Sequence, residues 1–376
     1  MIAAALLLAL AVGVQSAPHP APASPGKAGD ASFAAVATAA VQAWKENRDA
    51  DATRLLKQGL KLHPQWDDGL WYLGTLQYDH EDFRAARDLL RHYLALHPDK
   101  GAGWALTGMC DYKLREFDHA SEDLHRALAS DLRENPELAG SAEYYTALLL
   151  TRQEHFQDSA AILYELHRNE RGLHVNAPLE VPLGLAALGY ALLPEEAPAD
   201  RLEMIRQTGA GVFARFEQDR QSARRIFTEL LQHFPDEAGL HLQYGMVLLE
   251  DKDAGAIAEL EKAQQLAPSN PEARLALADH YLEEGQTSKA QESIDAALAI
   301  EPKLAGAHLL KGRILEKTGA LNDAIAQYES ARQLAPGDSR ILWALLRACR
   351  NAGRKEEAAQ LEEEIRKSGA WKSSNQ

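Results

Sequence analysis

The sequence predicts an all-α fold in which one helix–turn–helix unit repeats along the chain, and three observations lead to this prediction. The 376 residues contain 46% hydrophobic and 25% charged side chains, which excludes collagen, low-complexity and fully disordered chains. Prolines of the kind that end helices recur about every 34 residues. Within that period, small residues recur at one position and bulky residues at another.

The charge balance limits the classes of partner. The chain has 40 Lys and Arg against 55 Asp and Glu, a formal net charge of −15. A protein that binds nucleic acid or an anionic membrane without specificity needs a basic surface, so neither partner is predicted.

The first element, residues 1–16, has the pattern of a signal peptide. An apolar run from Ile2 to Val14 is shorter than the ~20 residues of a membrane-spanning helix but suits the core of a signal. Small residues at Val14 and Ser16 favour cleavage after Ser16. We expect an exported protein, periplasmic if its source is a Gram-negative bacterium. Because no Lys or Arg precedes the run, an uncleaved membrane anchor and a misassigned start codon both stay open.

The second element, residues 17–31, is predicted to be an extended linker, since four prolines lie among Ala and Ser there. No later run reaches 18 apolar residues, so no further membrane span is expected.

The repeats follow from the spacing of prolines and small residues. Pro64 and Pro98 both follow a Leu-His pair, and Pro235, Pro268, Pro302 and Pro336 continue the series at spacings of 33, 34 and 34 residues. In register with them, small residues recur in the first helix, among them Gly74, Gly108 and Gly312. Bulkier residues recur later in the unit between alanine positions, among them Leu90, Leu124 and Tyr328. Helices that cross closely need this complementarity.

This pattern resembles the tetratricopeptide repeat family, in an α-solenoid interrupted once. The resemblance covers an N-terminal array, 32–170, and a C-terminal array, 204–368, followed by a tail at 369–376. The units are 33–66, 67–100, 101–134, a degenerate 140–170, 204–236, 237–270, 271–304, 305–338 and 339–368.

The interruption, residues 171–203, contains four prolines and an apolar stretch that begins at Val181. The simplest interpretation is a short buried helix, and the alternative is a lid or a dimer contact. The sequence from Asp200 to Glu203 has the spacing of a capping box, so the next helix is expected to start at Asp200.

No catalytic, cofactor-binding or metal-binding motif is predicted. Residues 209–214 match the glycine pattern of a nucleotide-binding turn, but they follow a helical segment rather than a strand. The 14 histidines lack the three- or four-residue spacing of helical metal ligands. Cys110 and Cys349 fall on apolar helix faces and are predicted to be buried thiols.

The resemblance implies a concave groove lined by positions two, five, nine, twelve and thirteen of each unit. Aromatic and Arg side chains are common at binding hot spots, so eight groove residues are predicted to contact a partner. They are Trp44, Trp71, Tyr78, Met109, Tyr112, Trp343, Arg347 and Arg350. Any of them could instead pack on its neighbours. A basic patch is expected at the C-terminal end of the groove.

The predicted function is a non-catalytic scaffold in the cell envelope that binds a peptide or helix of a protein partner. Relatives that clamp the carboxylate tails of chaperones use basic residues where this chain has Trp71, Ala105 and Met109, so a more apolar peptide is expected. The alternative is an assembly subunit that self-associates or docks through 171–203. An enzyme with a novel site is the third class, and the sequence does not predict the oligomeric state.

Overall fold

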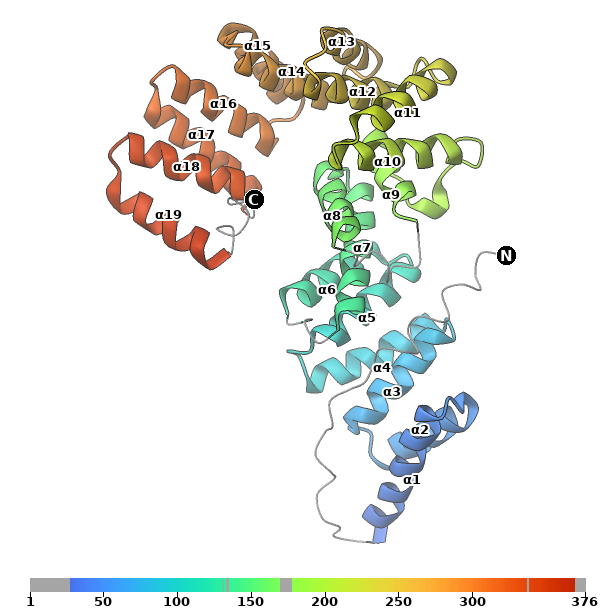
Figure 1. Cartoon of the computed structure of the whole chain (residues 1–376). Coiled ribbons are helices and arrows are strands. Elements are labelled where there is room, and N and C mark those ends of the chain that lie inside the picture. Colours follow the sequence, from blue (N-terminus) through green and yellow to red (C-terminus); the bar gives the residue numbers. More distant parts are fainter. Residues whose placement is uncertain (1–27, 131, 133–134, 170–177, 337, 369–376) are drawn as a thin grey trace. The chain divides into compact units, whose positions relative to one another are not determined.

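A computed structural model describes residues 28–130, 132, 135–169, 178–336 and 338–368 (Figure 1). All regular secondary structure in these residues is helical, which confirms the all-α prediction. The chain divides into two compact units, residues 1–213 and 214–376, with the division inside one helix.

One group of helices begins before the division. They are α1 (Ala28–Lys45), α2 (Asp49–Leu62), α3 (Asp67–Asp79), α4 (Phe83–Leu96), α5 (Gly101–Lys113), α6 (Phe117–Ala129), α7 (Pro136–Arg152), α8 (Phe156–Arg168), α9 (Glu180–Leu188), the 3₁₀ turn η2 (Pro194–Glu196) and α10 (Leu202–Phe216).

The remaining helices belong to the second unit. They are α11 (Arg220–His233), α12 (Ala238–Glu250), α13 (Ala256–Leu266), α14 (Glu272–Glu283), α15 (Thr287–Ile300), α16 (Ala305–Lys317), α17 (Leu321–Leu334), α18 (Ser339–Asn351) and α19 (Lys355–Ser368).

Successive helices pair as hairpins, with α5 packed on α6 and α16 on α17. The second helix of a pair ends where the sequence predicts. Helix α2 ends two residues before Pro64 and α15 two residues before Pro302, because proline disfavours helical backbone in the residue before it. Both units are therefore stacks of tetratricopeptide helix–turn–helix repeats, and α9 with η2 forms the interruption.

The small and bulky positions of one repeat face each other across the hairpin. A Cβ atom on Gly312 of α16 would lie 2.4 Å from the ring of Tyr328 on α17, which is fully buried. The missing side chain of Gly312 is thus the space that the Tyr328 ring occupies. This confirms that the recurring glycine reflects close helix packing.

The turn between the two helices of a repeat places one residue in left-handed backbone conformation. The six earlier turns use residues other than glycine, and the last three use glycine. The residues are Asn47, Glu81, Arg115, Glu154, Gln218, Lys252, Gly285, Gly319 and Gly353. The same turn geometry is therefore reached with backbone strain in the earlier repeats and without it in the last three.

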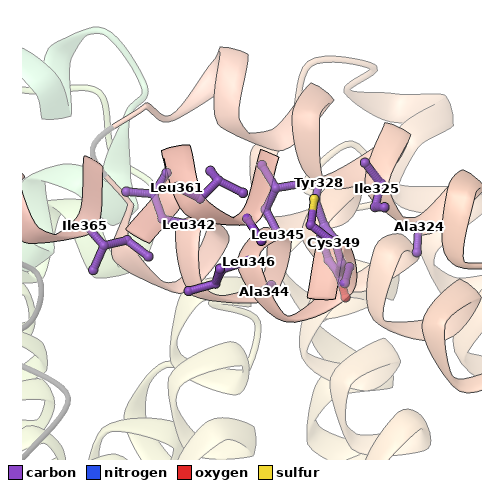
Figure 2. Packing of buried hydrophobic residues seen from close by; sticks show 12 residues of the cluster. Ala324, Ile325, Tyr328, Leu342, Ala344, Leu345, Leu346, Cys349, Leu361 and Ile365 are labelled. Atoms are coloured by element: carbon purple, nitrogen blue, oxygen red, sulfur yellow. The ribbon is translucent and has the colours of Figure 1, made fainter. Parts of the chain in front are cut away.

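The C-terminal helix α19 closes the second stack. Figure 2 shows Leu361 and Ile365 of α19 in one apolar cluster with Leu345 and Cys349 of α18. The neighbouring Glu362 is exposed. A helix with one apolar and one charged face is suited to end a stack of repeats, because its outer face is in contact with water.

Helix α9 is buried, as the simplest interpretation of 171–203 predicts. Leu183 and Leu185 have no exposed surface. Helix α10 crosses α9 so closely that a Cβ on Gly184 would lie 1.9 Å from the Ile205 carbonyl oxygen. A Cβ on Gly209 would lie 1.9 Å from the carbonyl oxygen of Glu180. Gly209 therefore serves helix packing rather than phosphate binding.

Two helices begin at residues other than those predicted. Helix α10 starts at Leu202, so the expected start at Asp200 is wrong by two residues. Residues 28–31, the end of the predicted linker, already belong to α1. The predicted signal 1–16, linker residues 17–27 and the tail 369–376 lie outside the described residues.

Candidate functional site

The first helices α1 and α3 carry a row of partly exposed aromatic side chains. Trp44 packs against Tyr72 with ring centroids 4.5 Å apart, and Trp71 packs against Tyr93 at 5.3 Å. Both tryptophans are half-buried at the edge of the same apolar cluster. Aromatic neighbours therefore fix the ring positions while part of each ring stays accessible.

Tyr78 extends this row towards the third repeat. It is half-buried and packs edge-on against Phe83 at 5.5 Å. Burial and the neighbouring Tyr145 raise the pKa of Tyr78 well above its ordinary value. Trp44, Trp71 and Tyr78 form what we call the aromatic face.

Met109 and Tyr112 of α5 do not continue this accessible surface. They are only 3% and 4% exposed, so the expectation that they face a partner is corrected. Every residue from 105 to 112 is buried, which means that no side of this part of α5 is open. Tyr112 packs edge-on against Tyr145 of α7, with ring centroids 4.7 Å apart.

Tyr112 also contacts the interruption between the two arrays. The Tyr112 hydroxyl donates a hydrogen bond of 3.2 Å to Oε1 of Glu195 in η2. The next residue, Glu196, accepts hydrogen bonds from Arg115 and, at 2.9 Å, from Arg152. We call residues 193–196 the acidic turn.

Phe117 at the start of α6 supports both arginines that hold the acidic turn. The Arg115 and Arg152 guanidinium carbons lie 5.3 Å and 4.6 Å from the centre of its ring. Cation–π contacts of this kind orient a guanidinium as well as attract it. We call Tyr112, Arg115, Phe117 and Arg152 the acidic-turn site.

The electrostatics of this site favour a carboxylate beside a neutral phenol. Burial and the Glu195 carboxylate raise the pKa of Tyr112, so its hydroxyl keeps the proton that it donates. Burial raises the pKa of Glu196, but the Leu193 backbone N–H and Arg115 outweigh it, and the pKa falls below its ordinary value. Glu196 is therefore ionised at neutral pH.

Charged side chains of α4, α5 and α6 form a cluster around the buried Asp111. Asp111 has no exposed surface and accepts hydrogen bonds from Arg87 (3.0 Å) and Arg91 (2.9 Å) of α4. Asp123 of α6 lies beside it. Burial and the charge of Asp111 raise the pKa of Asp123 to about 6. Sequence reasoning missed this cluster because the repeat pattern marks only apolar and small positions.

The three predicted C-terminal residues are placed differently from the aromatic face. Trp343 packs at the edge of the apolar cluster formed by α17, α18 and α19. The Arg347 guanidinium donates two hydrogen bonds to the carboxylate of Glu316 in α16, from Nε to Oε1 at 3.0 Å and from Nη2 to Oε2 at 2.9 Å. Arg350 bonds to Glu362 of α19 at 2.8 Å. The expectation of a basic patch is therefore wrong, because Arg347 and Arg350 are each paired with a carboxylate.

The contact of Arg347 with Glu316 belongs to a series between successive first helices. Asp279 of α14 pairs with Arg313 of α16 at 2.5 Å, and both occupy position nine of their repeats. Lys317 donates to the Leu282 carbonyl oxygen at 2.6 Å. We call Asp279, Arg313, Glu316 and Arg347 the charge ladder.

Other candidate chemistry is structural. Cys110 and Cys349 are both buried free thiols, as predicted, and burial raises the pKa of Cys110 to about 12. In the described part of the chain no cluster of three or more His, Cys, Asp or Glu side chains could hold a metal ion. None of the described helices is long and apolar enough to span a membrane.

A family model matches the C-terminal part of the chain. The family described as "N-terminal acetyltransferase A, auxiliary subunit" matches residues 262–362, less than half of the chain. No curated protein matches the sequence.

Three solved structures are similar in part. MamA is 22% identical over 44% of this chain and 96% of its own, with a TM-score of 0.37. Yeast Tom70 is 14% identical over 89% and 91%, with a TM-score of 0.38. The Cut9–Hcn1 heterotetramer of the APC/C is 13% identical over 92% and 88%, with a TM-score of 0.44.

Proposed function

We propose that this protein is a non-catalytic scaffold that binds a peptide or amphipathic helix of a protein partner on the aromatic face. The observation that carries the proposal is the bracing of Trp44 and Trp71 by Tyr72 and Tyr93. Rings that are already fixed lose little conformational entropy on binding, and half-exposed tryptophans supply apolar contact area. An apolar helix or extended segment is the partner chemistry that suits such a row.

A photo-crosslinking experiment tests this proposal in the full-length chain. A photoreactive amino acid at Thr75, which is half-buried at position nine of the second repeat, should give a specific adduct in the native host. The double variant Trp44→Ala/Trp71→Ala should lose that adduct while its helical circular dichroism stays unchanged.

Trp104→Ala is the matched control for that variant. Trp104 lies in the same array, but its indole donates to the Pro98 carbonyl oxygen and its ring stacks with Arg126. The adduct should survive this substitution. No adduct at all, or an adduct that persists in the double variant, would contradict binding at the aromatic face.

The location proposed for this scaffold is the cell envelope, on the basis of the apolar run at 2–14. The mass of the protein recovered from its host tests the proposal. A chain that begins at Ala17 supports export with cleavage, and an intact chain in the membrane fraction supports the anchored alternative. An intact chain in the cytosolic fraction would contradict both.

The alternative, assembly through 171–203, receives less support. The apolar residues of α9 that could have formed a docking surface, such as Leu183 and Leu185, are buried within the chain. We therefore place the partner surface on the aromatic face.

A further inference from the structure

The acidic turn contacts the N-terminal repeats through side chains, as a bound peptide would. Glu195 meets Tyr112 of α5, and Glu196 meets Arg115 in the turn after α5 and Arg152 at the end of α7. These contacts join residues 44 to 83 positions apart in sequence. The turn therefore bridges two repeats rather than extending one of them.

Two hydrogen bonds within residues 193–196 close the turn. The Glu196 N–H donates to the Leu193 carbonyl oxygen at 2.9 Å, and the Leu193 N–H donates to Glu196 Oε2 at 3.1 Å. Pro194 fixes one backbone dihedral angle of the same turn. A separate peptide with this sequence carries the same donors, acceptors and proline.

The base of the segment is held more firmly than its acidic tip. Leu193 has no exposed surface, and Arg201 donates to the Tyr190 hydroxyl at 2.7 Å. At the tip, the Arg115 side chain is 54% exposed and Glu196 is 22% exposed. Ion pairs in contact with water are individually weak, so the tip can leave the site while the base stays in place.

The acidic-turn site selects a particular ligand chemistry. Two guanidinium groups on one aromatic ring and a phenol that donates a hydrogen bond match two carboxylates on adjacent residues. A single carboxylate would leave part of this donor set unused. An apolar segment would bury the arginines without partners.

We propose that the acidic-turn site is a binding site for a peptide turn with two adjacent carboxylates, and that Glu195 and Glu196 at the tip of the acidic turn are its resident ligand. A partner segment of the same chemistry binds by displacing this tip. Because the resident turn is tethered next to the site, its effective concentration is high and the site is closed until a competitor arrives. This site is separate from the aromatic face and does not depend on the partner proposed for it.

Binding of a labelled peptide tests the proposal. The probe has the sequence of residues 190–199, and fluorescence anisotropy measures its affinity for the full-length chain. Glu195→Gln/Glu196→Gln weakens the resident turn without changing its size, so this variant should bind the probe at least ten-fold tighter than the unmodified chain. Glu203→Gln is the matched control, since Glu203 accepts hydrogen bonds from Arg206 and Gln207 of its own helix. It should leave the affinity unchanged.

Two further arms establish where the probe binds. Adding Arg152→Gln to the double variant should weaken probe binding at least ten-fold, and a probe with Gln at both Glu positions should not bind. Probe binding that is absent from the double variant, or that does not depend on Arg152, would overturn the proposal. Trp44→Ala/Trp71→Ala should not alter probe binding, so failure at the aromatic face is distinguishable from failure here.

The unmodified chain provides a readout that does not depend on any variant folding. Excess probe should open the resident turn and increase cleavage after Glu196 by a glutamate-specific protease. The Gln-substituted probe should leave the cleavage rate unchanged. A cleavage rate that does not respond to the acidic probe would also overturn the proposal.

Discussion

The polar side chain at position twelve of a first helix finds its hydrogen-bond partner differently in the two units. In the N-terminal unit, Tyr112 at position twelve is covered by the acidic turn, a segment outside the repeats. In the C-terminal unit, Glu316 at the same position pairs with Arg347 from the next repeat. A ligand would therefore compete with a movable segment in the first unit, but with ion pairs between neighbouring repeats in the second.

The largest expected difference between the two regions concerns their Asp–Arg contacts. Asp111→Ala would leave Arg87 and Arg91 without their buried partner, although Arg87 keeps Glu116 at 2.7 Å. Removing one partner of a buried pair costs about 3–5 kcal/mol. Asp279→Ala breaks a contact whose partners are 46% and 36% exposed and should cost about 1 kcal/mol or less. Urea unfolding monitored in each unit by hydrogen exchange would measure both, and equal losses would contradict the distinction.

The second prediction concerns Asp123, whose pKa is raised from 3.8 to about 6. A raised acid pKa means that its favourable contribution is complete below pH 3.8 and is lost as the pH rises through about 6. Asp123→Asn should therefore stabilise the N-terminal unit at pH 7.5 by up to about 3 kcal/mol, with the gain shrinking towards pH 4. Thermal unfolding between pH 4.5 and 7.5 measures this trend. A gain that is independent of pH would show that Asp123 does not titrate in this range.

The charge ladder should respond to pH in the opposite direction. Arg347 is the main cause of the lowered pKa of Glu316, and Tyr328 contributes a further hydrogen bond. This stabilisation is present above the ordinary glutamate pKa and is lost as the pH falls through the lower folded value. Glu316→Gln should cost about 1–2 kcal/mol at pH 7 and progressively less as the pH falls below the ordinary glutamate pKa. The same loss at every pH would contradict the role of its charge.

The smallest expected effect lies in the turns inside the repeats. Glu81 has a left-handed backbone that costs a non-glycine residue about 1 kcal/mol, so Glu81→Gly should gain at most about 1 kcal/mol. Gly319 has the same conformation with open space around its missing Cβ, so Gly319→Ala should lose a similar amount. Thermal unfolding of the two variants measures both. Changes of the same sign would show that the backbone conformation does not set the difference.

The repeat architecture could be predicted because its determinants are periodic in the sequence. Gly312 and Tyr328 stand 16 residues apart in one unit and belong to the recurring small and bulky series, and the structure places them in contact. The ion pair of Asp279 with Arg313 could also have been predicted from the sequence, since the two residues share position nine of successive units. Opposite charges at such positions predict an ion pair, which the expectation of a basic patch overlooked.

The cover over Tyr112 could not be predicted in this way. Glu195 lies 83 residues further along the chain, in a segment with no counterpart in the other repeats. No periodic pattern specifies where such a segment packs. A Pro-Glu-Glu sequence by itself is typical of an exposed turn, and only its contacts with Tyr112, Arg115 and Arg152 indicate a bound one.

Arg115 and Arg152 hold the tip of the acidic turn at Tyr112 in the N-terminal unit. Hydrogen exchange of residues 195–197 in the full-length chain tests this role most directly, with Arg115→Gln/Arg152→Gln compared with the unmodified protein. We expect exchange at these residues to accelerate at least ten-fold in the double variant, while exchange in α14 and α16 stays unchanged. Equal exchange rates for residues 195–197 in the two proteins would contradict the role of the two arginines.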